Sequence, residues 1–300
     1  MNTLEIKIGL DPEFMAKYKG KYIYPLLRKD NPVFKDIPAA ILKSLLPKLY
    51  KLSMDEFGHC VEIRPTAANS GKQLVLNTID AMAKLPSDFL YYGENTHCMD
   101  KALFISLVRK LGRKELSSSK NIYDQDILDD CPADLKARRA GKRLTFCGCH
   151  MHISATKKVS ITKDNVTLVE NQNVPLPEKA LVALFDDFIF KTMDKDPGFK
   201  IGRYRSPGFY ETKSHGGFEY RSLGASALTP KRLLLIADIM KKVTEHVISI
   251  GNVSEILFNK YGHKTVVSGL EFPKEICEMV DALSKTKPVK SDLRSLWVPF

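Results

Sequence analysis

The chain of 300 residues is 44% hydrophobic and 27% charged, which is ordinary for a soluble globular protein that buries a substantial core. No stretch approaches the roughly 20 consecutive apolar residues of a membrane span, and the N-terminus lacks the basic-then-apolar layout of a secretory signal. We therefore expect a cytoplasmic protein with no membrane partner and with its six cysteines as reduced thiols. The net charge of +11 favours anionic partners, among them nucleotides, nucleic acid and acidic polymers, without choosing between them.

The predicted elements, taken in chain order, are those of an α+β protein. A strand over 4–10 opens directly into Gly9-Leu10-Asp11-Pro12-Glu13-Phe14. Apolar spacing then predicts helices over 37–49, 71–85 and 101–111, the second preceded by Asn69 and Ser70 as candidate caps. Later segments predict a strand over 144–154, an amphipathic helix over 178–193, a strand over 217–223, and helices over 230–250 and 273–283.

Residues 112–141 are polar and include three consecutive serines, which predicts a long loop or a mobile insertion. No internal repeat, low-complexity tract or linker divides the sequence. We therefore expect a single domain that spans residues 1–300.

Four strand-like segments each place two polar side chains on one face, because residues i and i+2 of a strand point to the same side. The pairs are Asp11 with Glu13, Glu62 with Arg64, His150 with His152, and Glu219 with Arg221. If the segments are neighbours in one sheet, a single face carries several acids, two histidines and two arginines.

Adjacent carboxylates in a partly dry site repel each other unless cations lie between them. Mg²⁺ prefers carboxylate oxygens, and guanidinium groups match phosphate oxygens in bidentate geometry, so this set of residues indicates a metal–nucleotide site. Arg203 and Arg205, within the turn region 202–208, are further candidates for phosphate binding. The sequence contains neither the P-loop signature nor Gly-x-Gly-x-x-Gly, so neither of those nucleotide-binding modes is indicated.

Each motif also has a structural interpretation. Asp-Pro-Glu alone is more often a solvated turn, and each Glu–Arg pair could be a cross-strand ion pair. His150 and His152 could form a zinc site with the nearby Cys147 and Cys149, but the alternation places the cysteines on the opposite side of the strand. His215 is expected to be a loop residue, and the lysine and arginine clusters are expected to be solvated surface.

Four motifs, in this order, resemble those of the carboxylate-amine ligase family of tailed bacteriophages, within the glutamine synthetase-like superfamily. They are Gly-Leu-Asp-Pro-Glu-Phe, Val-Glu-Ile-Arg-Pro, Gly-Cys-His-Met-His-Ile and Gly-Phe-Tyr-Glu-Thr-Lys-Ser-His-Gly-Gly-Phe-Glu-Tyr-Arg-Ser-Leu. The resemblance covers about residues 5–225 and implies a glutamine synthetase-like domain, with a mostly antiparallel curved sheet and flanking helices. Each motif is weak alone, whereas the ordered set is fairly specific.

The resemblance also implies roles for individual residues. The metal ligands would be Asp11, Glu13, Glu62, His150 and Glu219. ATP would contact His150, His152, Arg205 and Arg221, and the catalytic groups would be Arg203, Arg205, Arg221 and Glu62. The family pattern has Glu at the position of Asp11, and Arg64 has no assigned counterpart.

By this resemblance the chain would use ATP and Mg²⁺, or Mn²⁺ in its place, to join a carboxylate to an amine through an acyl phosphate. The expected substrates are peptides, cell-wall peptides or proteins in the cytoplasm, which is the host cytoplasm if the gene belongs to a phage. Two other functions remain open. The chain could bind nucleic acid, or it could be a non-catalytic, virion-associated protein on the same fold.

Overall fold

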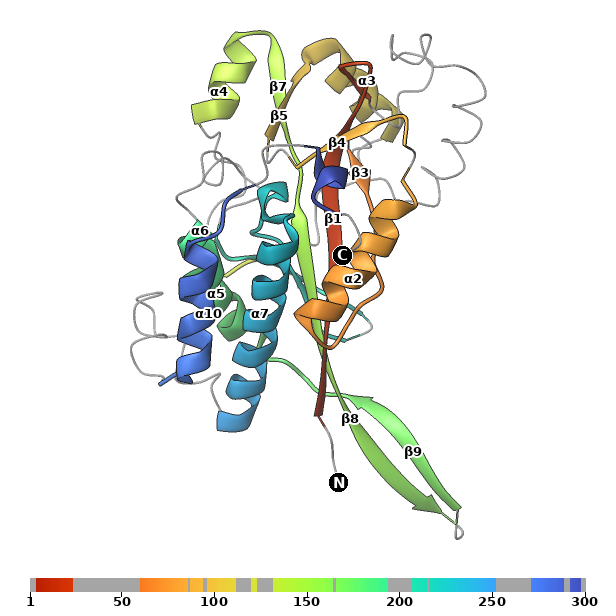
Figure 1. Cartoon of the computed structure of the whole chain (residues 1–300), viewed down its shortest axis with the longest axis vertical. Coiled ribbons are helices and arrows are strands. Elements are labelled where there is room, and N and C mark those ends of the chain that lie inside the picture. The colour runs from red at the N-terminus through yellow and green to blue at the C-terminus, as the bar shows by residue number, and fades with distance from the viewer. Residues whose placement is uncertain are drawn as a thin grey trace.

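The computed structural model describes residues 4–23, 60–85, 87–93, 96–111, 120–122, 132–163, 166–193, 207–214, 216–251, 271–288 and 292–297. Their fold is α+β, as the sequence predicted, with a curled antiparallel sheet and flanking helices (Figure 1). The predicted helix over 37–49 lies outside these residues. The single domain over 1–300 stays a prediction.

The main sheet has nine strands in the described part of the chain, and every pairing is antiparallel. Its main path runs β2-β1-β8-β11-β10-β6, while β3 and β4 also pair with β1 and β9 pairs with β8. The bounds are β1 Leu4–Tyr18, β2 Lys21–Ile23, β3 Val61–Glu62, β4 Leu90–Tyr92, β6 Lys120–Asn121, β8 Cys149–Lys163, β9 Val166–Asn173, β10 Phe209–Thr212 and β11 Phe218–Tyr220. A second, two-stranded sheet pairs β5 Thr96–Asp100 with β7 Lys142–Phe146.

The long strand β1 organises the sheet. Its even-numbered residues, such as Ile8, Leu10 and Phe14, are buried in the hydrophobic core. The odd-numbered residues form the opposite face, since side chains alternate along a strand. Because β1 extends to Tyr18, well past the predicted end at residue 10, β2, β3, β4 and β8 can all pair with it.

Helices pack against both sheets, with α2, α5 and α7 on the main sheet and α3 and α4 on the two-stranded sheet. Their bounds are α2 Gly71–Ala83, α3 Lys101–Leu111, α4 Pro132–Arg139, α5 Glu178–Phe185, α6 Lys191–Met193, α7 Pro230–Ile250 and α10 Lys274–Ser284, with 3₁₀ turns η3 Ala225–Ala227 and η4 Leu293–Ser295. Helix α7 contacts β1 and is flanked by α2 and α10 (Figure 1). The hydroxyl of Thr229 caps α7 by accepting a hydrogen bond from the Arg232 N–H, and Ser70 caps α2 in the same way, as predicted.

The predicted helix over 178–193 is present but is not a uniform α-helix. Between α5 and α6 lies the π-helical turn η2 Asp186–Phe190. The fully buried Asp186 accepts a hydrogen bond of 2.7 Å from the Tyr220 hydroxyl of β11. This contact joins the helix to the strand that carries Glu219, on the side away from the acids.

Two predictions need correction. The strand over 144–154 is divided, because Cys147 and Gly148 separate β7 from β8 and Gly148 instead bridges to Gly224. Residues 112–141 are not a loop throughout, since described residues there form β6 and α4, and the mobile insertion stays a prediction. Pro132 is the first residue of α4, and proline is common at the start of helices, but the polar composition of the segment favoured a loop prediction.

One feature that the sequence pattern did not predict is a projecting ribbon. Beyond Lys157, the last residue of β8 that pairs with β1, strands β8 and β9 continue as a two-stranded arm away from the body (Figure 1). No disulfide joins any two of the five described cysteines. None of the described helices combines the length and apolar character needed to cross a membrane.

Candidate functional site

The strand register brings the four polar pairs to one face of the sheet. Asp11 lies opposite His150, Glu13 opposite Glu62, and Glu219 opposite His152. Directly opposed residues of antiparallel strands point to the same side. The shared-face hypothesis required these strands to be neighbours, and β3, β1, β8 and β11 lie side by side in that order. They are far apart in the sequence.

The centre of this face is a buried trio of Glu13, His150 and Glu219, each no more than 7% exposed. Nδ1 of His150 lies 2.9 Å from Oε1 of Glu219 and 3.8 Å from Oε1 of Glu13. The other oxygen of Glu13 accepts a hydrogen bond of 2.5 Å from the Gly148 N–H. Because the strand is interrupted between β7 and β8, the Gly148 N–H is free of the sheet and donates to the buried Glu13 carboxylate.

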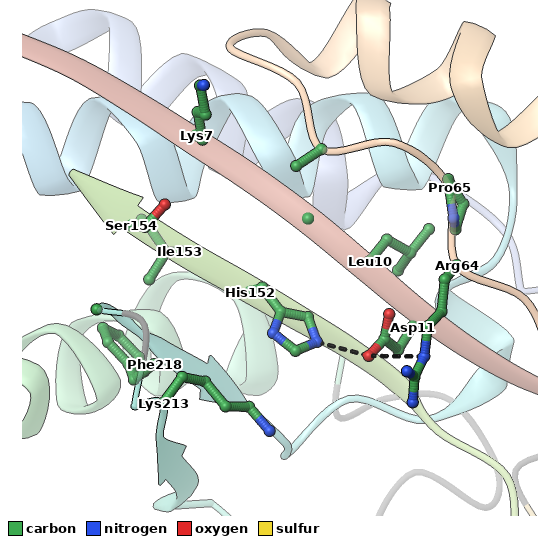
Figure 2. A pocket seen from close by; sticks show the side chains of 13 residues that line it. Lys7, Leu10, Asp11, Arg64, Pro65, His152, Ile153, Ser154, Lys213 and Phe218 are labelled. Carbon is green, nitrogen blue, oxygen red and sulfur yellow. Dashed lines mark hydrogen bonds and ion pairs between the residues drawn. The ribbon is translucent and has the colours of Figure 1, made fainter. Parts of the chain in front are cut away.

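On the β3 side, Arg64 joins two of the acids. Its Nε lies 2.9 Å from Oε1 of Glu62 and 3.8 Å from Oδ2 of Asp11. Nε2 of His152 lies 2.8 Å from the same oxygen of Asp11, and Figure 2 shows this carboxylate between the histidine and the arginine. Arg64, which the sequence left without a role, is thus the cationic partner of two predicted metal ligands.

On the far side, β10 adds two charged residues that sequence reasoning did not select. Glu211 accepts a hydrogen bond of 2.7 Å from Nη1 of Arg221. Lys213 forms ion pairs with Glu211, at 3.2 Å, and with Glu219. The signal was present as the alternation Tyr-Glu-Thr-Lys, which matches the other polar pairs.

Burial and neighbouring charge act differently on two of the acids. Burial raises the pKa of Glu62, and the hydrogen bond and charge of Arg64 offset only part of that rise. Burial would also raise the pKa of Glu219, but the hydrogen bond with His150 and the nearby positive charges outweigh it and hold that pKa well below its ordinary value. Glu219 is therefore a firmly ionised carboxylate in a dry setting.

The donor set fits a hard divalent cation. Within the described ranges, no three His, Cys, Asp or Glu side chains are placed so that they hold a metal ion together, and the carboxylates instead contact neighbouring lysine, arginine and histidine groups. Yet five carboxylates here face three lysine or arginine side chains, so the carboxylates outnumber these cations by two. One Mg²⁺ would balance that excess with the oxygen ligands it prefers.

A hollow of about 450 Å³ opens beside the acids (Figure 2). Residues of both charge signs and several small residues line it: Lys7, Gly9, Leu10, Asp11, Arg64, Pro65, Ala67, His152, Ile153, Ser154, Lys213, Gly216 and Phe218. Gly9 also lines it, and a Cβ there would lie 3.2 Å from the Cβ of His152. The hollow thus combines three cationic side chains with one position, Gly9, that has no side chain.

The remaining predicted residues divide into two groups. Arg203, Arg205 and His215 lie outside the described residues. Cys147 and Cys149 are fully buried in the hydrophobic core, whereas His150 points to the acids, so the described geometry does not join these residues into a zinc site.

Comparison with protein-family models gives no match, and comparison with curated proteins gives no match either. The functional conclusion therefore depends on the arrangement of the sheet face.

Proposed function

We propose that this chain is an ATP- and Mg²⁺-dependent ligase that joins a carboxylate to an amine, on a glutamine synthetase-like catalytic domain. One observation carries the proposal. The register that sets Asp11 against His150, Glu13 against Glu62 and Glu219 against His152 collects acids from three separate segments and histidines from a fourth on one face. A structural sheet has no need to bury several carboxylates together, because each of them costs desolvation energy.

In the proposed function, Asp11, Glu13, Glu62, Glu219 and His150 hold the metal. Bound Mg²⁺ would supply charge neutralisation and orientation of the ATP phosphates. Without metal, Arg64 and Lys213 form ion pairs with carboxylates that a metal would need as ligands. When metal and nucleotide are bound, these two side chains would instead contact the phosphates. Both side chains line the hollow, which supports this exchange of partners.

The hollow is the proposed site of the triphosphate. Lys7, Arg64 and Lys213 supply positive charge around it, and His152 projects into it from β8. Arg221, held by Glu211 at 2.7 Å, would stabilise the charge that develops on the transferred phosphoryl group. Arg203 and Arg205 keep the roles that the family resemblance gives them.

Two chemical steps follow. An oxygen of the substrate carboxylate bonds to the γ-phosphorus of ATP while the bond to ADP breaks, which leaves an acyl phosphate. The amine nitrogen then bonds to the acyl carbon, phosphate departs and the amine releases a proton, so that an amide remains. The low exposure of Glu13, Glu62 and Glu219 limits water at the site and thereby protects the acyl phosphate from hydrolysis.

We propose a peptide, cell-wall peptide or protein as the carboxylate or amine substrate. We do not propose nucleic-acid binding at this face, because its excess of negative charge would repel a phosphate backbone that brought no metal.

The test is a product search. Wild-type protein, ATP and Mg²⁺ are incubated with cell extract, and mass spectrometry is used to find a product one water lighter than two reactants combined. Glu219→Ala should abolish both this product and the accompanying amine-dependent ADP release, whereas Glu170→Ala on the exposed arm should not. An ATP-dependent product that persists undiminished with Glu219→Ala would sink the assignment.

A further inference from the structure

The two-stranded sheet and its two helices hold much of the positive charge of the chain. Strands β5 and β7 and helices α3 and α4 together contain eight lysine and arginine residues but only two acids. The cations are Lys101, Arg109, Lys110, Lys136, Arg138, Arg139, Lys142 and Arg143, and the acids are Asp100 and Asp134. The surplus of six positive charges in these four short elements is more than half of the net charge of +11.

Five of these cations gather at one corner of the two-stranded sheet, where β5 passes into α3 and α4 passes into β7. The Lys101 N–H donates a hydrogen bond of 3.3 Å to the Gly141 carbonyl, and Asp100 stands directly opposite Lys142. The first turn of α3 therefore lies beside the end of α4. Figure 1 shows this unit at the end of the molecule away from the β8–β9 arm. We define the basic corner as five exposed residues: Lys101, Lys136, Arg138, Arg139 and Lys142.

Helix stability explains only part of the basic corner. Lys136, Arg138 and Arg139 are in the last turn of α4, where cations interact favourably with the helix dipole. Lys101 is instead the first residue of α3, where the dipole disfavours a cation. Lys142 belongs to neither helix. Three elements thus contribute cations to one surface, and an anionic ligand at this surface accounts for Lys101, which the stability of α3 does not.

The side chains of this unit favour a ligand with a dense row of phosphates. Guanidinium and ammonium groups both bind phosphate oxygens, and Arg109 extends the exposed positive charge about 12 Å along α3 from Lys101. A nucleic-acid duplex carries one negative charge per roughly 1.7 Å of its axis. Sites for single strands use exposed aromatic rings on which bases stack. Among the described side chains of this unit, however, Phe104 is half-buried and His97 is buried.

We propose that the basic corner binds the phosphate backbone of a nucleic-acid duplex without reading its sequence. The driving force is the release of cations from the duplex when lysine and arginine take their place. This proposal does not depend on the ligase, because it needs neither ATP nor metal. It is also compatible with the carboxylates of the candidate site, since those residues belong to the main sheet and the basic corner to the two-stranded sheet and its helices.

Three triple variants separate the basic corner from positive charge in general. The corner variant carries Lys101→Gln, Lys136→Gln and Arg139→Gln. The charge-preserving variant carries Lys101→Arg, Lys136→Arg and Arg139→Lys. The control variant removes three exposed lysines at α7 and α10, through Lys231→Gln, Lys274→Gln and Lys285→Gln. Glutamine has nearly the helix propensity of lysine and arginine, so the helices should remain folded.

Fluorescence anisotropy measures binding of the full chain to labelled duplexes of about 20 base pairs at about 50 mM and about 200 mM KCl. Duplex DNA and duplex RNA are both used, because they share the phosphate backbone. The wild type should bind, and its affinity should fall steeply with salt. The corner variant should bind at least about tenfold more weakly at low salt, and its salt dependence should decrease by about one unit of log–log slope for each contact removed. The control and charge-preserving variants should bind as the wild type does.

No binding by the wild type to either duplex would overturn the proposal. So would an equal loss in the corner and control variants, because net charge alone would then explain the binding. Labelled polyglutamate tests an acidic protein as the partner, and tighter binding of polyglutamate than of both duplexes would also contradict the proposal. If urea unfolding shows that the corner variant is less stable than the control, Lys101→Gln alone repeats the test, with an expected loss of about one unit of slope.

Discussion

At the scale of single residues, the hydrogen bond between Tyr220 and Asp186 lies behind the site. Tyr220→Phe should lower the free energy of unfolding by about 1–3 kcal/mol, because the buried Asp186 carboxylate loses a hydrogen-bond donor. Urea unfolding at neutral pH measures this change. Tyr18→Phe, in a ring that packs on Phe89, is the control, with an expected change below about 0.5 kcal/mol. A similar loss in both variants would show that the Tyr220 hydroxyl has no special contribution.

The acids of the candidate site were predictable from the sequence, because the period of two along a strand is local information. Alternation alone selected Glu13, Glu62 and Glu219, and all three are buried on the shared face. The partners of these acids were not predictable. Arg64 contacts Glu62 within its own segment but also Asp11 from the first strand, and only the paired strands bring that second contact about.

At the scale of elements, helices with clear caps were predicted well and strand ends were not. The helices that begin after Ser70 and Thr229 start where their capping side chains indicated. Strand β1 continues to Tyr18 because residues that arrive from β2 and β4 complete its hydrogen bonds, which is tertiary information. The break at Gly148 likewise depends on Glu13, a residue 135 positions away.

The turn before β11 supports an element-scale prediction. Gly217 has φ +76°, and a Cβ there would overlap the carbonyl oxygen of Ile153 in β8. Gly217→Ala should therefore destabilise the fold by about 3 kcal/mol or more, through backbone strain together with the clash, and should displace Glu219 and Arg221.

Gly141→Ala provides the control for that substitution. Gly141 has φ +69° but no atom near its added Cβ, so it reports the strain alone, at about 1–2 kcal/mol. Urea unfolding of the two variants gives the comparison. Equal losses would mean that close approach of the turn to β8 is not what Gly217 provides.

At the scale of the whole molecule, the decisive information is which strands are neighbours. The acids come from β1, β3 and β11, which are separated by long stretches of sequence, and β8 supplies the histidines between them. The sequence near each strand does not indicate which distant strand will be its neighbour, because any two of these strands could form an antiparallel pair. The family resemblance concerned the order of the four motifs along the sequence. The register of the paired strands shows which of their residues lie opposite each other.

The charge of the whole chain differs from the charge of the candidate site. The chain carries a net charge of +11, yet on the described face of the sheet five carboxylates face three lysine or arginine side chains. The positive net charge of the chain favours an anionic ligand, whereas the carboxylates of the sheet face favour a cation. A phosphate that carries a bound metal ion satisfies both. A metal-bound nucleotide on this face meets both conditions.

Calorimetric titration with AMP-PNP, a non-hydrolysable ATP analogue, measures whether the protein binds such a nucleotide. Wild-type protein should bind AMP-PNP with Mg²⁺ and lose most of this binding without the metal. Glu219→Gln should weaken it at least about tenfold, because one charged ligand is removed, whereas Glu170→Gln on the arm should bind as the wild type does. Nucleotide binding that is indifferent to both Mg²⁺ and Glu219, or no binding by the wild type, would contradict a metal–nucleotide site on this face.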